Sequence, residues 1–87
     1  MNVFKEIRMQ KQLTQKDLAK ILAAANLTLG EITPDLISRW ENGVYYPNLS
    51  IRQWYAEYSN IPLSEINRRL LEDLKTPKAQ KLSLIHI

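Results

Sequence analysis

"ITPDLISRWENG" (residues 32–43) is the stretch that decides the fold, because it holds both a start and a stop signal for one short helix. Thr33 is a good N-cap, and Pro34 suits the first helical position, where its missing N–H would be unpaired anyway. Asp35 suits the positive end of the helix dipole. The Asn-Gly pair at the end is a turn signal, so the helix has about two to three turns.

This predicted helix has two faces. Leu36, Ile37 and Trp40 share one side. The polar side chains of Asp35, Ser38, Arg39 and Asn42 lie on the other sides.

Four further segments have apolar residues at helical spacing. We expect helices over residues 2–12 and 13–25, another following Asn48, and a last one that Ser64 caps and that ends by residue 74. Thr14 caps the second of these, with Asp17 as a capping-box partner. Their apolar stripes are Val3, Phe4 and Ile7; Leu18, Leu22 and Ala25; Ile51, Trp54, Tyr55 and Tyr58; and Ile66, Leu70, Leu71 and Leu74.

The length and composition indicate one small all-α domain. At 87 residues the chain buries a marginal core, so we expect it to gain from a partner or from dimerisation. It has no cysteine, no apolar run long enough to span a bilayer, and no apolar signal-peptide segment at its N-terminus. We therefore expect a cytoplasmic protein without disulfides and without a membrane segment.

The net charge of +3 suggests nucleic-acid binding, but its distribution weakens that inference. Lys75, Lys78 and Lys81 follow the last predicted helix, so residues 1–74 keep nine of the twelve basic side chains and all nine acidic ones. Residues 75–87 form a basic tail that we expect to be flexible. Its lysines could hold phosphates, its "LSLIHI" alternation could add a strand, or it could be disordered.

Several motifs follow one another in a particular order: "LTQKDLAKIL" (residues 13–22), "ISRWENG" (37–43), Pro47 and "LSEI" (63–66). In this order they resemble the Cro and lambda-repressor type of helix-turn-helix protein, also called the XRE family. The resemblance covers about residues 2–66. A purely structural helical bundle would not need this signature.

The resemblance implies a five-helix helix-turn-helix domain over residues 1–74, with the third helix in the major groove of operator DNA. Gln15 and Asn42 would then touch phosphates. The residues that would face the bases or the flanking backbone are Pro34, Asp35, Ser38 and Arg39.

Two features depart from the family pattern. The turn between the second and third helices is lengthened by roughly eight residues between Leu22 and Ile32, where the family has a tight turn. The leading end of the third helix also suits DNA badly. Pro34 has no donor, and Asp35 would meet a polyanion unless it accepts a hydrogen bond from cytosine N4.

The size, the lengthened turn and this pattern are similar to the modulator-of-repression type of protein from lactococcal temperate phages. Such proteins are antirepressors that bind the DNA-binding domain of a phage repressor. The similarity implies a genetic-switch regulator whose third helix, helped by the inserted turn, Tyr45 and Tyr46, blocks operator binding by the repressor. Asp35 could pair with the arginines or lysines that the repressor offers to DNA.

The alternative that the resemblance implies is a Cro-like repressor that binds operator DNA directly as a dimer. Its fifth helix would be a candidate dimer surface. Its contacts to DNA would come from Gln15, Ser38, Arg39 and Asn42.

Each candidate also has a plainer interpretation. Asp35 suits the first turn of any helix, and Ser38 and Arg39 could simply face solvent. Leu27 and Leu29 in the inserted turn could form an apolar knob for a partner or could cover a gap in the small core.

The aromatic residues have the spacing of core residues. Trp40, Trp54, Tyr55 and Tyr58 could stack on bases, but at helical spacing they favour a core. Tyr45 and Tyr46 lie in a loop and stay open for an interface, where tyrosine is common.

No pattern of a catalytic, metal or cofactor site is present in the sequence. There is no Gly-rich phosphate loop and no histidine cluster, and His86 is the only histidine. Glu72 and Asp73 are adjacent on a helix and do not converge on one site. We expect a protein that is not an enzyme and that has no cofactor and no small-molecule substrate.

Overall fold

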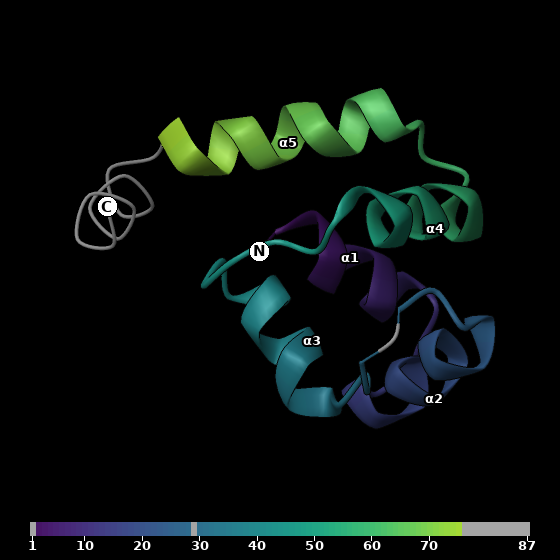
Figure 1. Ribbon diagram of the computed structural model, residues 1–87. Helices are drawn as coiled ribbons and strands as arrows, with labels where there is room; N and C mark the ends of the chain where they lie inside the picture. Colours follow the sequence, from purple (N-terminus) through teal and green to yellow (C-terminus); the bar gives the residue numbers. More distant parts are fainter. Residues whose placement is uncertain (1, 29, 76–87) are drawn as a thin grey trace.

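The computed structural model describes residues 2–28 and 30–75, which form five α-helices (Figure 1). Within these ranges no strand occurs, so the predicted all-α class is confirmed. Leu29 and the predicted tail beyond Lys75 lie outside the described residues. The helices are α1 (Val3–Gln10), α2 (Gln15–Ala25), α3 (Pro34–Glu41), α4 (Leu49–Ser59) and α5 (Leu63–Lys75).

Side-chain caps begin the first four helices, as the sequence predicts for three of them. Thr14 and Asp17 form a capping box, in which the Thr14 hydroxyl accepts from the Asp17 N–H at 3.0 Å and the Asp17 carboxylate accepts from the Thr14 N–H at 3.2 Å. Each bond satisfies a backbone donor that the first turn of the helix leaves free. The other caps are Asn2, Thr33 and Asn48.

The start of α5 differs from the prediction. Ser64 is not the cap, because the helix already begins at Leu63 and the Pro62 carbonyl accepts from the Glu65 and Ile66 N–H groups at 2.9 and 3.1 Å. The chain is helical directly after the proline, whose ring fixes a helix-compatible φ. The helix also includes Lys75, one residue beyond the predicted boundary.

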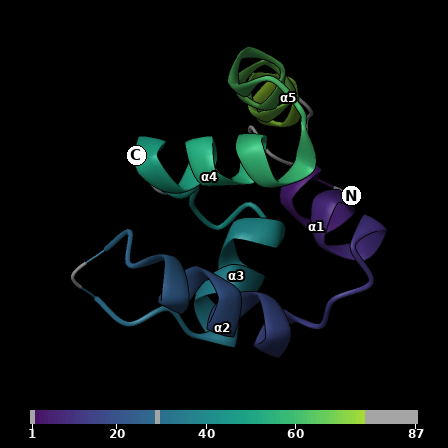
Figure 2. The same ribbon diagram turned by 90° about the vertical axis from the view of Figure 1, so that its right-hand side faces the viewer.

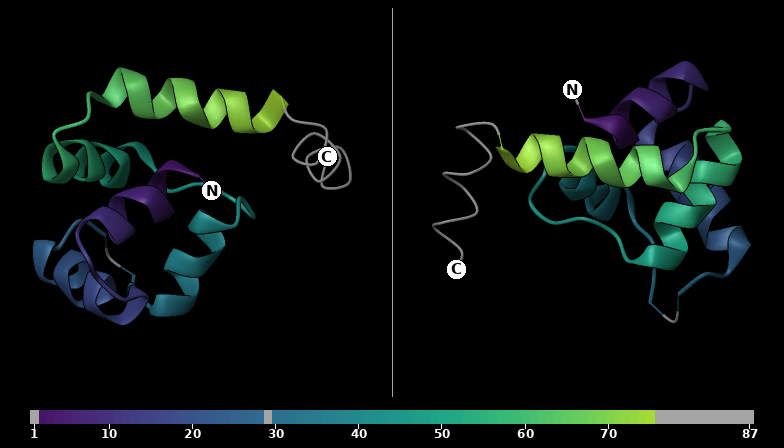
Figure 3. Two further views of the ribbon diagram at one scale, coloured as in Figure 1. Left: turned by 180° about the vertical axis from the view of Figure 1, so that it is seen from behind. Right: turned by 90° about the horizontal axis from the view of Figure 1, so that it is seen from above.

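The five helices are arranged in three levels. α2 packs against α3 at one end of the molecule, while α5 lies along the opposite end, over α4 and α1 (Figures 1 and 3). α1 lies between these levels and contacts α3, α4 and α5. One face of α3 is therefore held from inside by α1 and α2, which leaves its other face available to solvent.

The core is built from the predicted apolar stripes. Phe4 and Tyr55 are fully buried at its centre, with their ring centroids 4.8 Å apart, and Trp40 meets Tyr55 edge-on at 6.4 Å. Trp54 and Tyr58 are only half-buried and stack on each other at 4.6 Å, so they flank the core and do not fill it. The other buried apolar residues are Val3, Ile7, Leu18, Ala19, Leu22, Ile32, Ile37, Ile51, Ala56, Ile66 and Leu70.

Leu71 departs from the predicted stripe of α5. Its side chain is 58% exposed, whereas Ile66 and Leu70 are buried. The stripe of Ile66, Leu70 and Leu71 is wider than the face that α5 buries against α4 and α1. The side chain of Leu74, the fourth residue of the predicted stripe, lies outside the described part of the chain. Leu71 is thus a surface residue, and the predicted core role for it is wrong.

The connection between α2 and α3 projects from the body of the molecule (Figure 2). Leu27 packs against the core cluster and Ile32 is buried, so at both ends the connection is attached to the domain. Leu27 therefore covers part of the small core, which was one of the two roles predicted for it. Across the described residues, no helix is both long enough and apolar enough to cross a membrane.

Candidate binding surface on helix α3

Four predicted contact residues lie along the outward side of α3. Asp35, Arg39 and Asn42 are exposed and Ser38 is half-buried. Their spacing of three and four residues places them in one row on a helix. The buried Ile37 and Trp40 hold the opposite side of α3 in the core.

Within this row the polar side chains bind one another. The Arg39 Nε donates to an Asp35 carboxylate oxygen at 3.0 Å, although both side chains are largely exposed, at 52% and 74%. The Asn42 amide donates to the Ser38 carbonyl at 2.8 Å and to the Ser38 hydroxyl at 3.2 Å. The guanidinium that a DNA reader would aim at a base or phosphate is therefore directed toward the carboxylate one turn before it.

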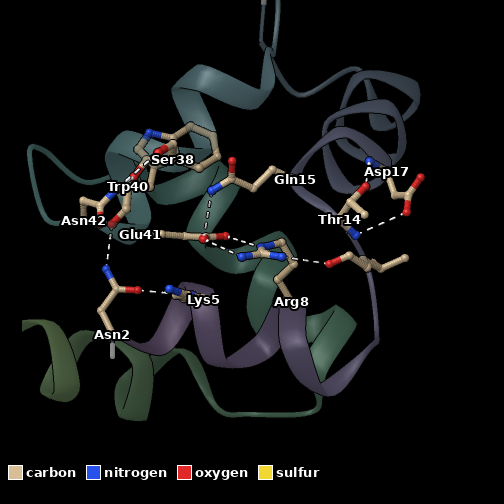
Figure 4. A network of polar contacts seen from close by, with 11 residues as sticks. Asn2, Lys5, Arg8, Thr14, Gln15, Asp17, Ser38, Trp40, Glu41 and Asn42 are labelled. Atoms are coloured by element: carbon tan, nitrogen blue, oxygen red, sulfur yellow. Dashed lines mark hydrogen bonds and ion pairs between the residues drawn. The ribbon is translucent and has the colours of Figure 1, made fainter.

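The trailing end of α3 is fixed by a buried ion pair (Figure 4). Glu41 has a side chain only 2% exposed, and it accepts from Arg8 Nε at 2.7 Å and from a second Arg8 nitrogen at 3.0 Å. The hydrogen bonds that Arg8 donates to the Glu41 carboxylate raise the pKa of Arg8 above its ordinary value, against the opposing effect of burial. A two-pronged contact of this kind sets both distance and orientation between α1 and α3.

One further contact ties the start of α1 to the same end of α3, and another ties Arg8 to the α1–α2 turn. The Asn2 amide donates to the Trp40 carbonyl at 2.6 Å while its oxygen caps α1. Arg8 also donates to the Leu13 carbonyl at 2.9 Å, which connects the pair to the α1–α2 turn. The last carbonyls of a helix need partners from outside it, and here α1 supplies one.

The structure places Gln15 in this buried network. Its amide nitrogen donates to Glu41 Oε1 at 3.2 Å, and the side chain is directed toward Glu41 in Figure 4. Gln15 is therefore not in the outward row of α3. Its position at the start of α2 serves the junction between α1, α2 and α3.

The two loop tyrosines are placed differently. Tyr45 is 44% exposed, while Tyr46 packs toward Phe4 with ring centroids 6.1 Å apart. Burial, with a smaller contribution from Asp73, raises the pKa of Tyr46. Of these two tyrosines, only Tyr45 is exposed, and it lies next to the end of α3. Pro34 is exposed at the start of α3.

The exposed charge of residues 30–48, the segment that contains α3, is slightly negative. Glu31 and Asp35 are exposed carboxylates, Arg39 is an exposed guanidinium, and Glu41 is buried against Arg8. Between residues 30 and 48 no other charged side chain occurs. Lysines at positions 16 and 20 are exposed, but they belong to α2. The outward face of α3 thus has no excess of positive charge of its own.

Sequence reasoning missed the buried polar group of Asn2, Arg8 and Glu41. A signal for two of them existed. Glu41 lies four residues after Ile37, and Arg8 lies four residues after Phe4, so each charge occupies a position on the apolar side of its helix. A charge at such a position is buried only with a partner, and the two opposite charges could have been matched.

Comparisons with protein-family models, with curated proteins and with solved structures each gave no match. Among residues 2–28 and 30–75, no group of three or more His, Cys, Asp or Glu side chains could hold a metal ion. What can be argued about function therefore comes from the surface of α3.

Proposed function

We propose that this protein is an antirepressor of a phage-type genetic switch, which binds the DNA-binding domain of a repressor and blocks its access to the operator. The observation that supports this most is the exposed Asp35–Arg39 pair on the outward row of α3. A helix that reads DNA needs donors and positive charge on that row.

Electrostatics favour a cationic partner over a nucleic acid. DNA presents a dense row of phosphates, and binding it depends on neutralising several of them with Lys or Arg. Residues 30–48, which include α3, expose two carboxylates and one guanidinium; the exposed lysines nearest in the fold, Lys16 and Lys20, belong to α2. The same surface complements a protein domain that presents arginines and lysines for its own DNA.

The Asp35–Arg39 pair does not obstruct such an interaction. Exposed ion pairs one helical turn apart contribute only about 0.3 to 0.5 kcal/mol, so the pair opens readily. Asp35 can exchange Arg39 for a guanidinium or ammonium of the repressor. Arg39 is then free for an acidic or carbonyl group at the edge of the same interface.

Reversing the charge of Asp35 tests this proposal. Asp35→Lys should weaken binding to the DNA-binding domain of a temperate-phage repressor by at least about tenfold, the effect of losing about 1.4 kcal/mol. The same variant should raise nonspecific DNA affinity. Binding of the fluorescently labelled repressor domain would be followed by anisotropy at physiological salt.

Glu57→Lys is the matched control for this experiment. Glu57 is exposed on α4, and the substitution makes the same change in net charge away from α3. The control should raise nonspecific DNA affinity similarly and leave repressor binding unchanged. Equal effects of the two variants on repressor binding would argue against α3 as the binding surface.

A second candidate function is direct operator binding as a Cro-like dimer. The exposed guanidinium of Arg39, the Ser38 hydroxyl and the Asn42 amide on one row favour it, as do the exposed Lys16 and Lys20 on α2. On this alternative, Arg39→Ala should cost about 1 to 3 kcal/mol of operator affinity if the side chain contacts a base. Unchanged operator affinity would count against that contact.

A further inference from the structure

Helix α5 is connected to the rest of the molecule by a short hinge, residues 60–62. α4 ends directly before this hinge, and α5 turns sharply after it to lie across α4 and α1 (Figures 1 and 3). Asn60 has a φ of +60°, which residues other than glycine seldom adopt. Pro62 in addition disfavours the helical conformation at Ile61. The hinge is therefore both short and restricted in conformation.

Two polar contacts and an apolar stripe hold α5 in its place. Arg69 on α5 forms an ion pair with Glu6 on α1, and their side chains are only 25% and 37% exposed. The Arg52 guanidinium on α4 donates to the Asn67 side-chain oxygen on α5 at 2.8 Å. The polar partners of α5 therefore lie on α1 and α4, which precede the hinge in the chain. The buried apolar residues of α5 are Ile66 and Leu70.

A second copy of the chain presents the same surface on its own α1 and α4. Because the partners of α5 precede the hinge, a copy whose hinge is extended can place α5 on its neighbour and keep the same contacts. Exchange of an identical element is a low-cost route to a dimer, and short hinges under strain favour it. α2 and α3 pack against each other at the opposite end of the molecule, so each copy keeps its own α2 and α3.

We propose that this chain forms a dimer by exchanging α5, so that α5 of each copy lies against α1 and α4 of the other copy. The Glu6–Arg69 ion pair and the Arg52–Asn67 hydrogen bond then join two copies. The exchange uses the buried side of α5, and not the side on which Leu71 is 58% exposed. It does not depend on the proposed function, which rests on α3.

Opposite charge reversals at the Glu6–Arg69 pair test the exchange in the full chain. Glu6→Arg opposes two guanidiniums and Arg69→Glu opposes two carboxylates, so each chain alone repels its own α5. In a mixture of the two chains, exchange of α5 restores an opposite-charge pair at both positions. After the chains are unfolded in urea and refolded together, sedimentation velocity and native mass spectrometry should show the heterodimer in at least about tenfold excess over either homodimer.

Three further variants serve as controls. The double variant Glu6→Arg/Arg69→Glu restores the pair within one chain, so it should dimerise to the same extent as the wild type and gain nothing from mixing. Leu71→Ser should leave the dimer fraction of the wild type unchanged, because Leu71 is on the exposed side of α5. A flexible Gly-Gly-Ser-Gly insertion after Asn60 should lower the dimer fraction, because a longer hinge lets α5 close on its own chain.

Two results would overturn the exchange. One is a refolded mixture of Glu6→Arg and Arg69→Glu in which both chains stay monomeric and the thermal unfolding is the sum of that of the separate chains. The other is a wild-type dimer that the hinge insertion leaves unchanged or that Leu71→Ser abolishes, because the copies would then associate through their outer surfaces. If one charge variant does not fold alone, the mixture still decides, since only exchange restores both ion pairs.

Discussion

The two ends of α3 are held in opposite ways. At the trailing end Glu41 is buried and accepts from Arg8 and Gln15. At the leading end Asp35 is 74% exposed and pairs, within the described part of the chain, only with Arg39, which is itself exposed. The trailing end therefore anchors α3 to the domain, and the leading end is presented to solvent. Stability and binding should therefore respond to different residues of the same short helix.

The largest expected effect comes from breaking the anchored end. Glu41→Ala removes the carboxylate that pairs with Arg8, whose side chain is only 14% exposed, and removing one partner of a buried pair costs about 3 to 5 kcal/mol. Urea unfolding followed by circular dichroism measures it. Asp35→Ala at the presented end is the control and should change stability by at most about 0.5 kcal/mol. Equal losses at the two ends would remove the distinction between them.

A smaller loss of stability is expected at Gly43, where α3 passes into the loop that leads to α4. Gly43→Ala places a Cβ at a φ of +73°, where its nearest neighbour is the Tyr46 hydroxyl at an ordinary 3.5 Å. The cost is therefore backbone strain alone, about 1 to 2 kcal/mol. Thermal and urea unfolding would measure it.

Gly30→Ala is the control for that substitution. Nothing lies within 4 Å of a Cβ added at Gly30, which does not have a left-handed φ. Alanine at position 30 should leave the stability unchanged or raise it by up to about 1 kcal/mol, because it lowers the conformational entropy of the unfolded chain. If Gly43→Ala behaved in the same way, the fixed turn after α3 would be in question.

A substitution of Tyr55, near the anchored end of α3, should have the opposite effect on stability. Its hydroxyl is buried near Glu41 and has no hydrogen-bond partner among the described residues. Burial raises the pKa of Tyr55, with a smaller contribution from Glu41, so the phenol stays neutral. Tyr55→Phe should leave stability unchanged or raise it by about 1 kcal/mol, because an unsatisfied group is removed. A clear loss in urea unfolding would mean that the hydroxyl is satisfied.

The smallest effect concerns a cap at the surface, away from both ends of α3. Hydrogen bonds from Thr14 hold the pKa of Asp17 below its ordinary value. The stability that a lowered carboxylate pKa contributes is present above the unfolded pKa and is lost as the pH falls through the folded one. The difference in stability between wild type and Asp17→Asn should therefore narrow as the pH falls below about 4. A difference that stays constant from pH 7 to pH 3 would contradict this.

Much of the fold follows from local signals in the sequence. Thr14, Thr33 and Asn48 begin helices because a side-chain oxygen accepts from an N–H of the first turn, which depends only on neighbouring residues. Ser64 shows the limit of such signals, since α5 already begins at Leu63, directly after Pro62. Leu71 shows another limit of local signals, because helical spacing does not predict how wide an apolar stripe the neighbouring helices cover.

The candidate site could be predicted only in part. The row from Asp35 to Asn42 follows from helix geometry, and the structure places these side chains outward. The contact of Gln15 and Arg8 with Glu41 joins residues 26 and 33 positions apart, and no local pattern specifies which distant charge is the partner.

The most direct test is a competition titration at physiological salt. A labelled operator fragment bound to the repressor's DNA-binding domain is titrated with this protein, and the same fragment is titrated with this protein alone. The charge distribution on α3 predicts release of the operator in the first titration and no sequence-selective binding in the second. Tight, sequence-selective binding of the operator by the protein alone would contradict the antirepressor mechanism.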